Sequence, residues 1–203
     1  MLNCPHVPVL ALLMALIVPL AGCKLAPQGQ PISWIRQAHI GGPFNLIDQD
    51  GQPVSDTSLQ GKYRIIYFGY TFCPDACPTD MQQLMSGFRI FERAHPDKAT
   101  KVQPIFITVD PARDNPAHLK AFVRAFHPRL MGLTGTPAQI AAVAKEYAAV
   151  YQAQKPGPNG KYLVDHSRTA VLYGPQGAPL ILLSIGTVGT PQRIADELAA
   201  GVR

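Results

Sequence analysis

The chain of 203 residues carries 18 Lys and Arg against 13 Asp and Glu, which gives a formal net charge of +5 at pH 7. No basic run with interleaved aromatic residues occurs, so the composition argues against nucleic-acid binding. A mild attraction to an acidic partner or a membrane surface is compatible with this charge.

The N-terminus has the pattern of an export signal. The first 22 residues contain no Lys, Arg, Asp or Glu, and residues 9–20 are almost wholly apolar. An apolar stretch of about a dozen residues is short for a membrane-spanning helix and typical of a signal peptide. Residues 20–23, Leu-Ala-Gly-Cys, resemble the lipobox of bacterial lipoproteins. We expect a signal peptide over 1–22 and lipidation of Cys23, with an uncleaved signal anchor as the alternative; either way the folded part lies outside the cytoplasm, tethered to a membrane.

The rest of the chain is expected to form a tether and one domain. Residues 24–42 are rich in Gln, Pro and Gly, which is typical of a flexible tether. The mature chain of about 180 residues suits one compact domain, over residues 43–203. Once the signal peptide is removed and Cys23 carries the lipid, this domain keeps Cys73 and Cys77 as its cysteines. A disulfide between residues so close constrains little, so we expect the pair to be chemical rather than structural.

Buried strands alternate with helices along the domain. An apolar run and a turn near residues 44–54 predict an N-terminal hairpin. Further strands are predicted over 63–70, 103–109, 130–133, 169–173 and 179–184, and helices over 78–94, 116–126, 138–150 and 191–200. This order predicts an α/β fold, a thioredoxin-like sandwich whose mixed central sheet has helices on both faces. The N-terminal hairpin and the helix 138–150 are additions to that core.

Two cysteines follow the predicted strand 63–70, in residues 72–78, Phe-Cys-Pro-Asp-Ala-Cys-Pro. Side chains four positions apart lean to one face of a helix. The N-terminus of that helix favours the thiolate, the form that metal binding and disulfide exchange both need. Two thiolates with one imidazole suit a thiophilic metal, above all copper. The same thiols can instead form a reversible disulfide, and their spacing leaves both interpretations open.

His166 and Asp110 are the other candidate site residues. Ligands of open α/β sheets gather beyond the carboxyl ends of the strands. Asp110 lies at the carboxyl end of the strand 103–109, and His166 lies in a loop just before the strand 169–173. We expect His166 to complete a metal site with the thiols, the alternative being a solvated loop histidine. Asp110 is expected to orient the ligands as a neighbouring carboxylate, or else to end the strand in an Asp-Pro turn.

Three other residues have structural interpretations. Met81 and Met85 follow the second cysteine at helical spacing, and they fit a buried core better than thioether ligation. Asp114 precedes the predicted helix 116–126 and is expected to act as its N-cap.

Three runs of the sequence together carry a resemblance to a known family. They are residues 67–78 (Tyr-Phe-Gly-Tyr-Thr-Phe-Cys-Pro-Asp-Ala-Cys-Pro), 109–114 (Val-Asp-Pro-Ala-Arg-Asp) and 165–167 (Asp-His-Ser). From about residue 42 to the C-terminus, the chain closely resembles the Sco/SenC family of copper proteins. That family has a thioredoxin-like fold, is anchored to membranes, binds copper through two cysteines and one histidine, and supports assembly of the binuclear copper centre of cytochrome c oxidase.

The resemblance implies a metallochaperone, which passes copper on by ligand exchange and need not catalyse a reaction. Its cargo would be copper, as Cu(I) or Cu(II), held by Cys73, Cys77 and His166 with Asp110 beside them. The implied partners are the copper-bearing subunit of cytochrome c oxidase, a periplasmic copper donor, a thioredoxin-like reductant, and the membrane through the lipid anchor. A role in oxidase assembly implies the periplasmic side of the inner membrane.

The competing hypothesis is an enzyme that uses the same thiols. It would be a periplasmic thiol–disulfide reductase acting on the cysteines of an acceptor, or a peroxiredoxin-like peroxidase. Thioredoxin-type enzymes typically place a cis-proline before the strand that faces the cysteines, whereas residues 167–169, Ser-Arg-Thr, contain no proline. Copper delivery is therefore favoured over thiol chemistry alone, although both can operate in one protein.

Overall fold

The computed structural model describes residues 32–203, so the predicted signal peptide and Cys23 lie outside the described residues. The strands are β1 (Ser33–Trp34), β2 (Asn45–Asp48), β3 (Pro53–Ser55), β4 (Tyr63–Gly69), β5 (Val102–Thr108), β6 (Met131–Thr134), β7 (Tyr151–Ala153), β8 (Val164–His166), β9 (Ala170–Tyr173) and β10 (Pro179–Leu183). The helices are α1 (Ala76–Ala94), α2 (Pro96–Ala99), α3 (Pro116–Phe126), α4 (Pro137–Glu146) and α5 (Pro191–Gly201), with short 3-10 helices η1 (Thr57–Leu59) and η2 (Gly186–Val188).

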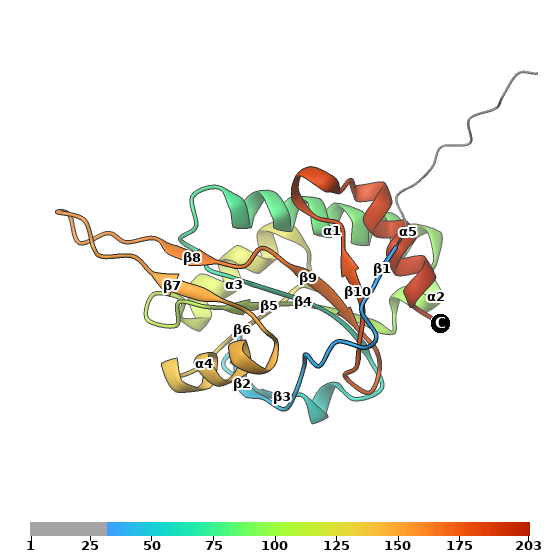
Figure 1. The fold of residues 1–203 in the computed structure, drawn as a ribbon, viewed down its shortest axis with the longest axis horizontal. Helices are drawn as coiled ribbons and strands as arrows, with labels where there is room; N and C mark the ends of the chain where they lie inside the picture. Colours follow the sequence, from blue (N-terminus) through green and yellow to red (C-terminus); the bar gives the residue numbers. More distant parts are fainter. Residues whose placement is uncertain (1–31) are drawn as a thin grey trace, which may run out of the picture. The chain divides into compact units, whose positions relative to one another are not determined.

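An eight-stranded mixed sheet runs through the described unit in the order β1-β10-β9-β4-β5-β6-β2-β3. Figure 1 shows α1 and α5 on one face of this sheet and α4 on the other. Along β4 the side chains alternate accordingly: the hydroxyl of Tyr67 bonds Asp80 on α1, while Phe68 packs against Tyr147 at the end of α4. The expected α/β sandwich, with its N-terminal hairpin β2–β3 and the extra helix α4, is confirmed.

The two central strands bring their carboxyl ends to one edge. All seven residues of β4 are buried, which explains its continuous apolar sequence. β4 and β5 are parallel and in register up to the pair Gly69 and Thr108. β9 lies antiparallel on the other side of β4, with Ala170 opposite Tyr67, so the chain enters β9 at the same edge. The segments 70–75, 109–114 and 164–169 therefore meet there.

Three helices begin at a proline that follows a capping side chain. Asn115 accepts a hydrogen bond from the backbone N–H of His118, and Thr136 forms a capping box with Gln139. The expected N-cap at Asp114 is wrong, because Asn115 holds that position. Asp114 is instead fully buried and bonded to threonines of two other segments.

Short strands account for two differences from the expected layout. Ser33–Trp34 pair with β10, so this part of the expected tether 24–42 belongs to the sheet. β7 and β8 form a separate two-stranded sheet in which Tyr151 lies opposite His166. His166 therefore ends a strand rather than lying in a loop. Strands of two or three residues show no alternation of apolar and polar residues that a sequence could reveal.

The helix α4 ends at Glu146, four residues earlier than expected from the range 138–150. Ala148 takes a positive φ of 52°, and its left-handed backbone cannot continue the helix. Within residues 32–203, no helix combines the length and the apolar character needed to cross a membrane.

A buried histidine lies between α1 and α3. His127 is 4% exposed, and its Nε2 lies 2.9 Å from Oε2 of Glu92. Its Nδ1 accepts a hydrogen bond from the backbone N–H of Arg129, so we assign the proton to Nε2. Burial lowers the pKa of His127 and outweighs the opposite effect of Glu92. The fold therefore holds this imidazole neutral.

We expect His127 to make stability fall in mild acid. Its folded-state pKa lies below the unfolded value of about 6.5, so the unfolded chain takes up the proton first and stability is lost as the pH falls through about 6.5. His127→Asn keeps an acceptor for the Arg129 N–H and removes the titration. Urea unfolding should show a smaller loss of free energy between about pH 7.5 and pH 5 in His127→Asn than in wild type, while the exposed His118→Asn behaves as wild type. Equal losses in all three proteins would refute this.

Candidate metal centre

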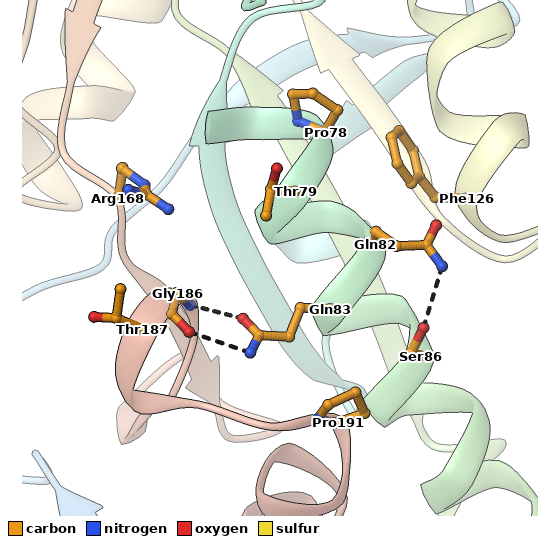
Figure 2. A pocket seen from close by; sticks show the side chains of 10 residues that line it. All are labelled: Pro78, Thr79, Gln82, Gln83, Ser86, Phe126, Arg168, Gly186, Thr187 and Pro191. Carbon is orange, nitrogen blue, oxygen red and sulfur yellow. Dashed lines mark hydrogen bonds between the residues drawn. The ribbon is translucent and has the colours of Figure 1, made fainter. Parts of the chain in front are cut away.

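A groove of about 790 Å³ runs beside α1, from Pro78 in its first turn to Pro191 at the start of α5 (Figure 2). The 3-10 helix η2 and Arg168 form its far wall. Cys73, Cys77 and His166 do not line this groove. The predicted donors lie instead at the carboxyl edge of the sheet, next to the end of the groove marked by Pro78.

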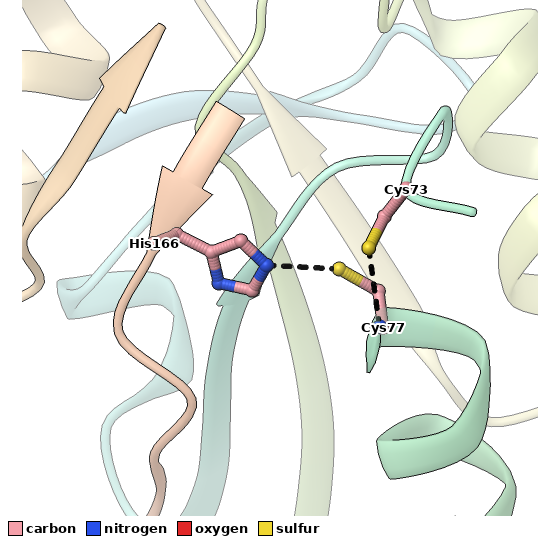
Figure 3. Close-up of side chains that lie close together, drawn as sticks. All are labelled: Cys73, Cys77 and His166. Carbon is pink, nitrogen blue, oxygen red and sulfur yellow. Dashed lines mark hydrogen bonds between the residues drawn. The ribbon is translucent and has the colours of Figure 1, made fainter. Parts of the chain in front are cut away.

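The structure brings the three predicted donors together (Figure 3). The two sulfurs and a ring nitrogen of His166 all lie within 4.8 Å of one another. Within residues 32–203, no other group of three or more His, Cys, Asp and Glu residues comes as close together. Both cysteines are free thiols.

Helix α1 positions the thiols. Cys77 lies in its first turn and is 0% exposed, whereas Cys73 precedes the helix and is half-buried. The backbone N–H of Cys77 points at Sγ of Cys73, at a distance of 3.4 Å. The unpaired N–H groups of a helix N-terminus stabilise negative charge on sulfur. Cys73 is therefore the sulfur that combines access from solvent with a hydrogen bond from the first turn of α1.

His166 points a lone pair at the buried sulfur. Its Nδ1 lies 3.1 Å from the carbonyl oxygen of Ser167, so we assign the ring proton to Nδ1. Nε2 is then unprotonated, and it lies 3.1 Å from Sγ of Cys77. The rings of Tyr67 and Tyr70 meet the imidazole edge-on, at centroid distances of 6.2 and 5.8 Å. The tyrosine rings thus restrict the plane of the imidazole, and the bond to the Ser167 carbonyl sets its tautomer.

Burial sets the protonation of both groups in this contact. Desolvation raises the pKa of the Cys77 thiol well above its ordinary value and lowers the pKa of His166. In the metal-free protein at neutral pH, a neutral thiol therefore faces a neutral imidazole. Two sulfurs and one neutral imidazole nitrogen make a donor set that suits copper, and a metal that displaces the thiol proton gains a thiolate ligand.

Asp110 has no hydrogen bond to this cluster among the contacts of the described residues. Its carboxylate is 4% exposed, and it accepts hydrogen bonds from Nε of Arg113 and from the hydroxyl of Tyr162. Arg113 also donates to the Tyr162 carbonyl and stacks over the Tyr162 ring at 3.7 Å. Asp110 therefore joins the end of β5 to the segment that leads into β8 and His166.

Two other buried carboxylates lie at this edge: Asp114, which the sequence predicted only as an N-cap, and Asp80, which sequence reasoning missed. Asp114 accepts hydrogen bonds from the N–H and the hydroxyl of Thr71, at 2.9 and 2.6 Å, and so holds the start of the cysteine loop. Asp80 is fully buried on α1 and binds Tyr67 and Arg168. Its position among the apolar residues of the buried face of α1 was a signal that could have revealed it. Met81 and Met85, next to it, are fully buried in the core, as expected.

Comparisons with known proteins identify the relatives of this chain. The family model described as SCO1/SenC matches residues 33–203. The mitochondrial SCO2 homolog of Mus musculus is 42% identical over 151 residues, which are 74% of this chain and 58% of that protein. The chain spans about half the length of the curated relatives it matches.

Solved structures extend the comparison. ScoI of Bradyrhizobium japonicum, solved with copper bound, has a TM-score of 0.70 and 40% sequence identity over 80% of this chain and 99% of that chain. BsSco, described as a member of the Sco family of cytochrome c oxidase assembly proteins with a disulfide switch, has a TM-score of 0.60 and 26% identity over 79% of this chain and 91% of that chain.

Gly69, the last residue of β4, provides the space for the Cys77 sulfur. A Cβ there would lie 3.0 Å from Sγ of Cys77 and 2.9 Å from the ring of Phe106. Gly69→Ala should therefore lower the free energy of unfolding by about 1–3 kcal/mol through overpacking. Gly174→Ala is the control, since its Cβ would meet Leu180 at an ordinary contact distance of 3.5 Å. Urea unfolding measures both variants, and equal stability of the two would refute the tight fit.

Proposed function

The chain belongs to the SCO1/SenC family, and we propose that it is a metallochaperone that delivers copper to the binuclear copper centre of cytochrome c oxidase during assembly. The observation that carries this proposal is the convergence of two free thiols and one neutral imidazole nitrogen within 4.8 Å. The copper bound to ScoI of Bradyrhizobium japonicum supports it. The oxidase as the recipient is supported by the family description of BsSco.

Cys73, Cys77 and His166 are the proposed ligands. Cu(I) suits a low-coordinate site of two thiolates and an imidazole, whereas Cu(II) adds water or another oxygen ligand toward tetragonal geometry. Cys77 is the buried ligand, whereas Cys73 and His166 are both half-buried, so an acceptor's own donor atom would reach the metal from the side of these two ligands. Asp110 would act indirectly, by holding the segment that leads to His166.

The same thiols supply a redox control. Joining the two sulfurs in a disulfide releases two electrons and two protons, and it removes both sulfur ligands from copper. A thioredoxin-like reductant would therefore be needed before loading by a periplasmic copper donor. We place the domain on the periplasmic side of the inner membrane, anchored through lipid on Cys23, and this part of the proposal rests on residues 1–23 of the sequence.

Thiol–disulfide exchange with an acceptor is the second candidate function. It is favoured by one specific observation, which is that both thiols are free and lie close enough to join after a small movement. As a reductase of the acceptor's cysteines, the protein would need its two sulfurs but not His166. The requirement for His166 therefore distinguishes copper delivery from thiol–disulfide exchange.

We expect His166→Ala to abolish tight copper binding and to leave the thiol–disulfide potential nearly unchanged. The test uses the full chain in detergent with Cys4→Ser and Cys23→Ser, which keeps Cys73 and Cys77 as its thiols and is called the two-thiol chain. Loss of a direct ligand should weaken copper binding by more than the about 10- to 100-fold that loss of an outer hydrogen-bond partner costs.

Competition titrations measure copper affinity, and thiol redox titrations measure the potential. The matched control is His118→Ala, an exposed histidine on α3. Unchanged copper affinity in His166→Ala would contradict copper delivery and favour the thiol–disulfide function.

A further inference from the structure

A fully buried carboxylate lies on α1 one helical turn beyond Cys77. Asp80 is 0% exposed and accepts a hydrogen bond of 2.9 Å from the hydroxyl of Tyr67. It also accepts two from Arg168, of 2.9 Å from Nε and 2.6 Å from Nη2. Two parallel bonds from one guanidinium form a bidentate pair, which fixes direction as well as distance. A buried carboxylate is costly unless it is paired, so the fold strongly favours keeping Arg168 at this position.

This ion pair joins the two segments that carry the proposed ligands Cys77 and His166. Asp80 is on the helix of Cys77, and Arg168 follows His166 by two residues. Among the described residues, the side-chain hydrogen bonds between segment 164–169 and α1 are the Cys77–His166 contact and those of Arg168 to Asp80. The ion pair therefore restrains His166 relative to Cys77 independently of the contact between them.

The loop at η2 keeps Arg168 in place. The side chain of Gln83 on α1 accepts a hydrogen bond from the N–H of Gly186 and donates to its carbonyl, at 2.7 and 3.2 Å (Figure 2). Gly186, at a positive φ of 71°, lies against the guanidinium: a Cβ there would be 3.6 Å from Nη2 of Arg168. The other side of Arg168 faces the groove, and its side chain is 48% exposed. The arginine is thus held between α1 and η2 and can be substituted without opening the core.

Other contacts of His166 come from the rings of Tyr67 and Tyr70, which meet it edge-on, and from the backbone of its own ribbon. The N–H of Ser167 donates to the carbonyl of Val150 at 2.8 Å, which joins His166 to the start of β7. β7 and β8 form their own two-stranded sheet and are not hydrogen-bonded into the central sheet. A two-stranded ribbon on its own is only marginally stable, so contacts to the rest of the fold hold it in place. The hydrogen bonds from Arg168 to α1 therefore add a direct restraint between the segment of His166 and the helix of Cys77.

We propose that Arg168 and Asp80 are positioning residues that set the approach of the His166 imidazole to Cys77, and thereby the direction of the nitrogen donor at copper. This inference rests on the proposed copper function. It predicts that Cu(II), whose tetragonal geometry requires a well-directed nitrogen, is more sensitive to the ion pair than Cu(I), which two thiolates hold.

The test substitutes the arginine in the two-thiol chain. Arg168→Gln removes the positive charge and the bidentate hydrogen bonding of the guanidinium. Arg168→Lys keeps the positive charge but places it on a single ammonium group. Arg168→Gln should weaken Cu(II) binding about 10- to 100-fold, the range typical of outer hydrogen-bond partners, and should shift the Cu(II) paramagnetic resonance spectrum. The Cu(II) affinity and the Cu(II) spectrum of Arg168→Lys should lie between those of Arg168→Gln and wild type. Cu(I) affinity should change less than Cu(II) affinity in both variants.

Two further variants separate positioning from stability. Glu197 is another fully buried carboxylate, bonded to Nε of Arg193 at 2.8 Å and to the N–H of Ser184 at 2.9 Å, on α5. Glu197→Gln should lose stability and keep the wild-type copper spectrum. Arg168→Gln alone leaves the buried Asp80 carboxylate without its partner. The double variant Asp80→Asn with Arg168→Gln removes that charge, so it should fold even if Arg168→Gln alone does not. It should still show the altered copper spectrum. An equal spectral shift in Glu197→Gln would overturn the proposal.

A copper-free measurement keeps the inference apart from the proposed function. In the reduced, metal-free two-thiol chain, a nuclear Overhauser contact between the His166 ring and the Cys77 side chain should be strong, and it should weaken in Arg168→Gln. If the wild type binds no copper, the proposed function fails, and this contact still decides whether Arg168 positions His166. An unchanged contact and an unchanged copper spectrum in Arg168→Gln would overturn the positioning role.

Discussion

The contact between Sγ of Cys77 and Nε2 of His166, at 3.1 Å, is the interaction on which the account depends. It joins residues 89 positions apart, so it exists only because the sheet delivers both segments to one edge. The parallel register of β4 and β5 and the antiparallel entry of β9 do this. The rings of Tyr67 and Tyr70 restrict the plane of the imidazole, and the bond from Nδ1 to the carbonyl of Ser167 directs the lone pair of Nε2 to the sulfur.

Three buried aspartates each hold one of the segments that meet at this edge. Asp114 bonds Thr71 at the start of the cysteine loop, and Asp110 bonds Tyr162 ahead of β8. Asp80 bonds the arginine that follows His166. None of these carboxylates has a hydrogen bond to Cys73, Cys77 or His166 among the contacts of residues 32–203. A buried carboxylate must be fully hydrogen-bonded, so each aspartate holds the segment to which it bonds in one position. The three donors are therefore positioned before any metal binds.

Long, regular elements could be predicted from the sequence, and short or non-local ones could not. The buried run of β4 and the helical spacing in α1 and α3 are visible within one segment, and the structure has those elements within two residues of the expected bounds. β7 and β8 have three residues each and gain their stability from pairing with each other, so the sequence predicted a loop, and not a strand, for His166 before the strand 169–173. The cysteine spacing and the family resemblance indicated the three donors. The bond from Arg168 to Asp80, residues 88 positions apart, leaves no trace in a single sequence, and Asp114 was misinterpreted because its position before a helix is also that of a cap.

X-ray absorption at the copper edge, on the reduced two-thiol chain loaded with one equivalent of Cu(I), tests the central claim most directly. The spectrum should show one ion bound by two sulfurs and one imidazole nitrogen, with the nitrogen signal absent in His166→Ala. A spectrum with sulfur ligands alone in the wild type, or one that His166→Ala leaves unchanged, would contradict this claim.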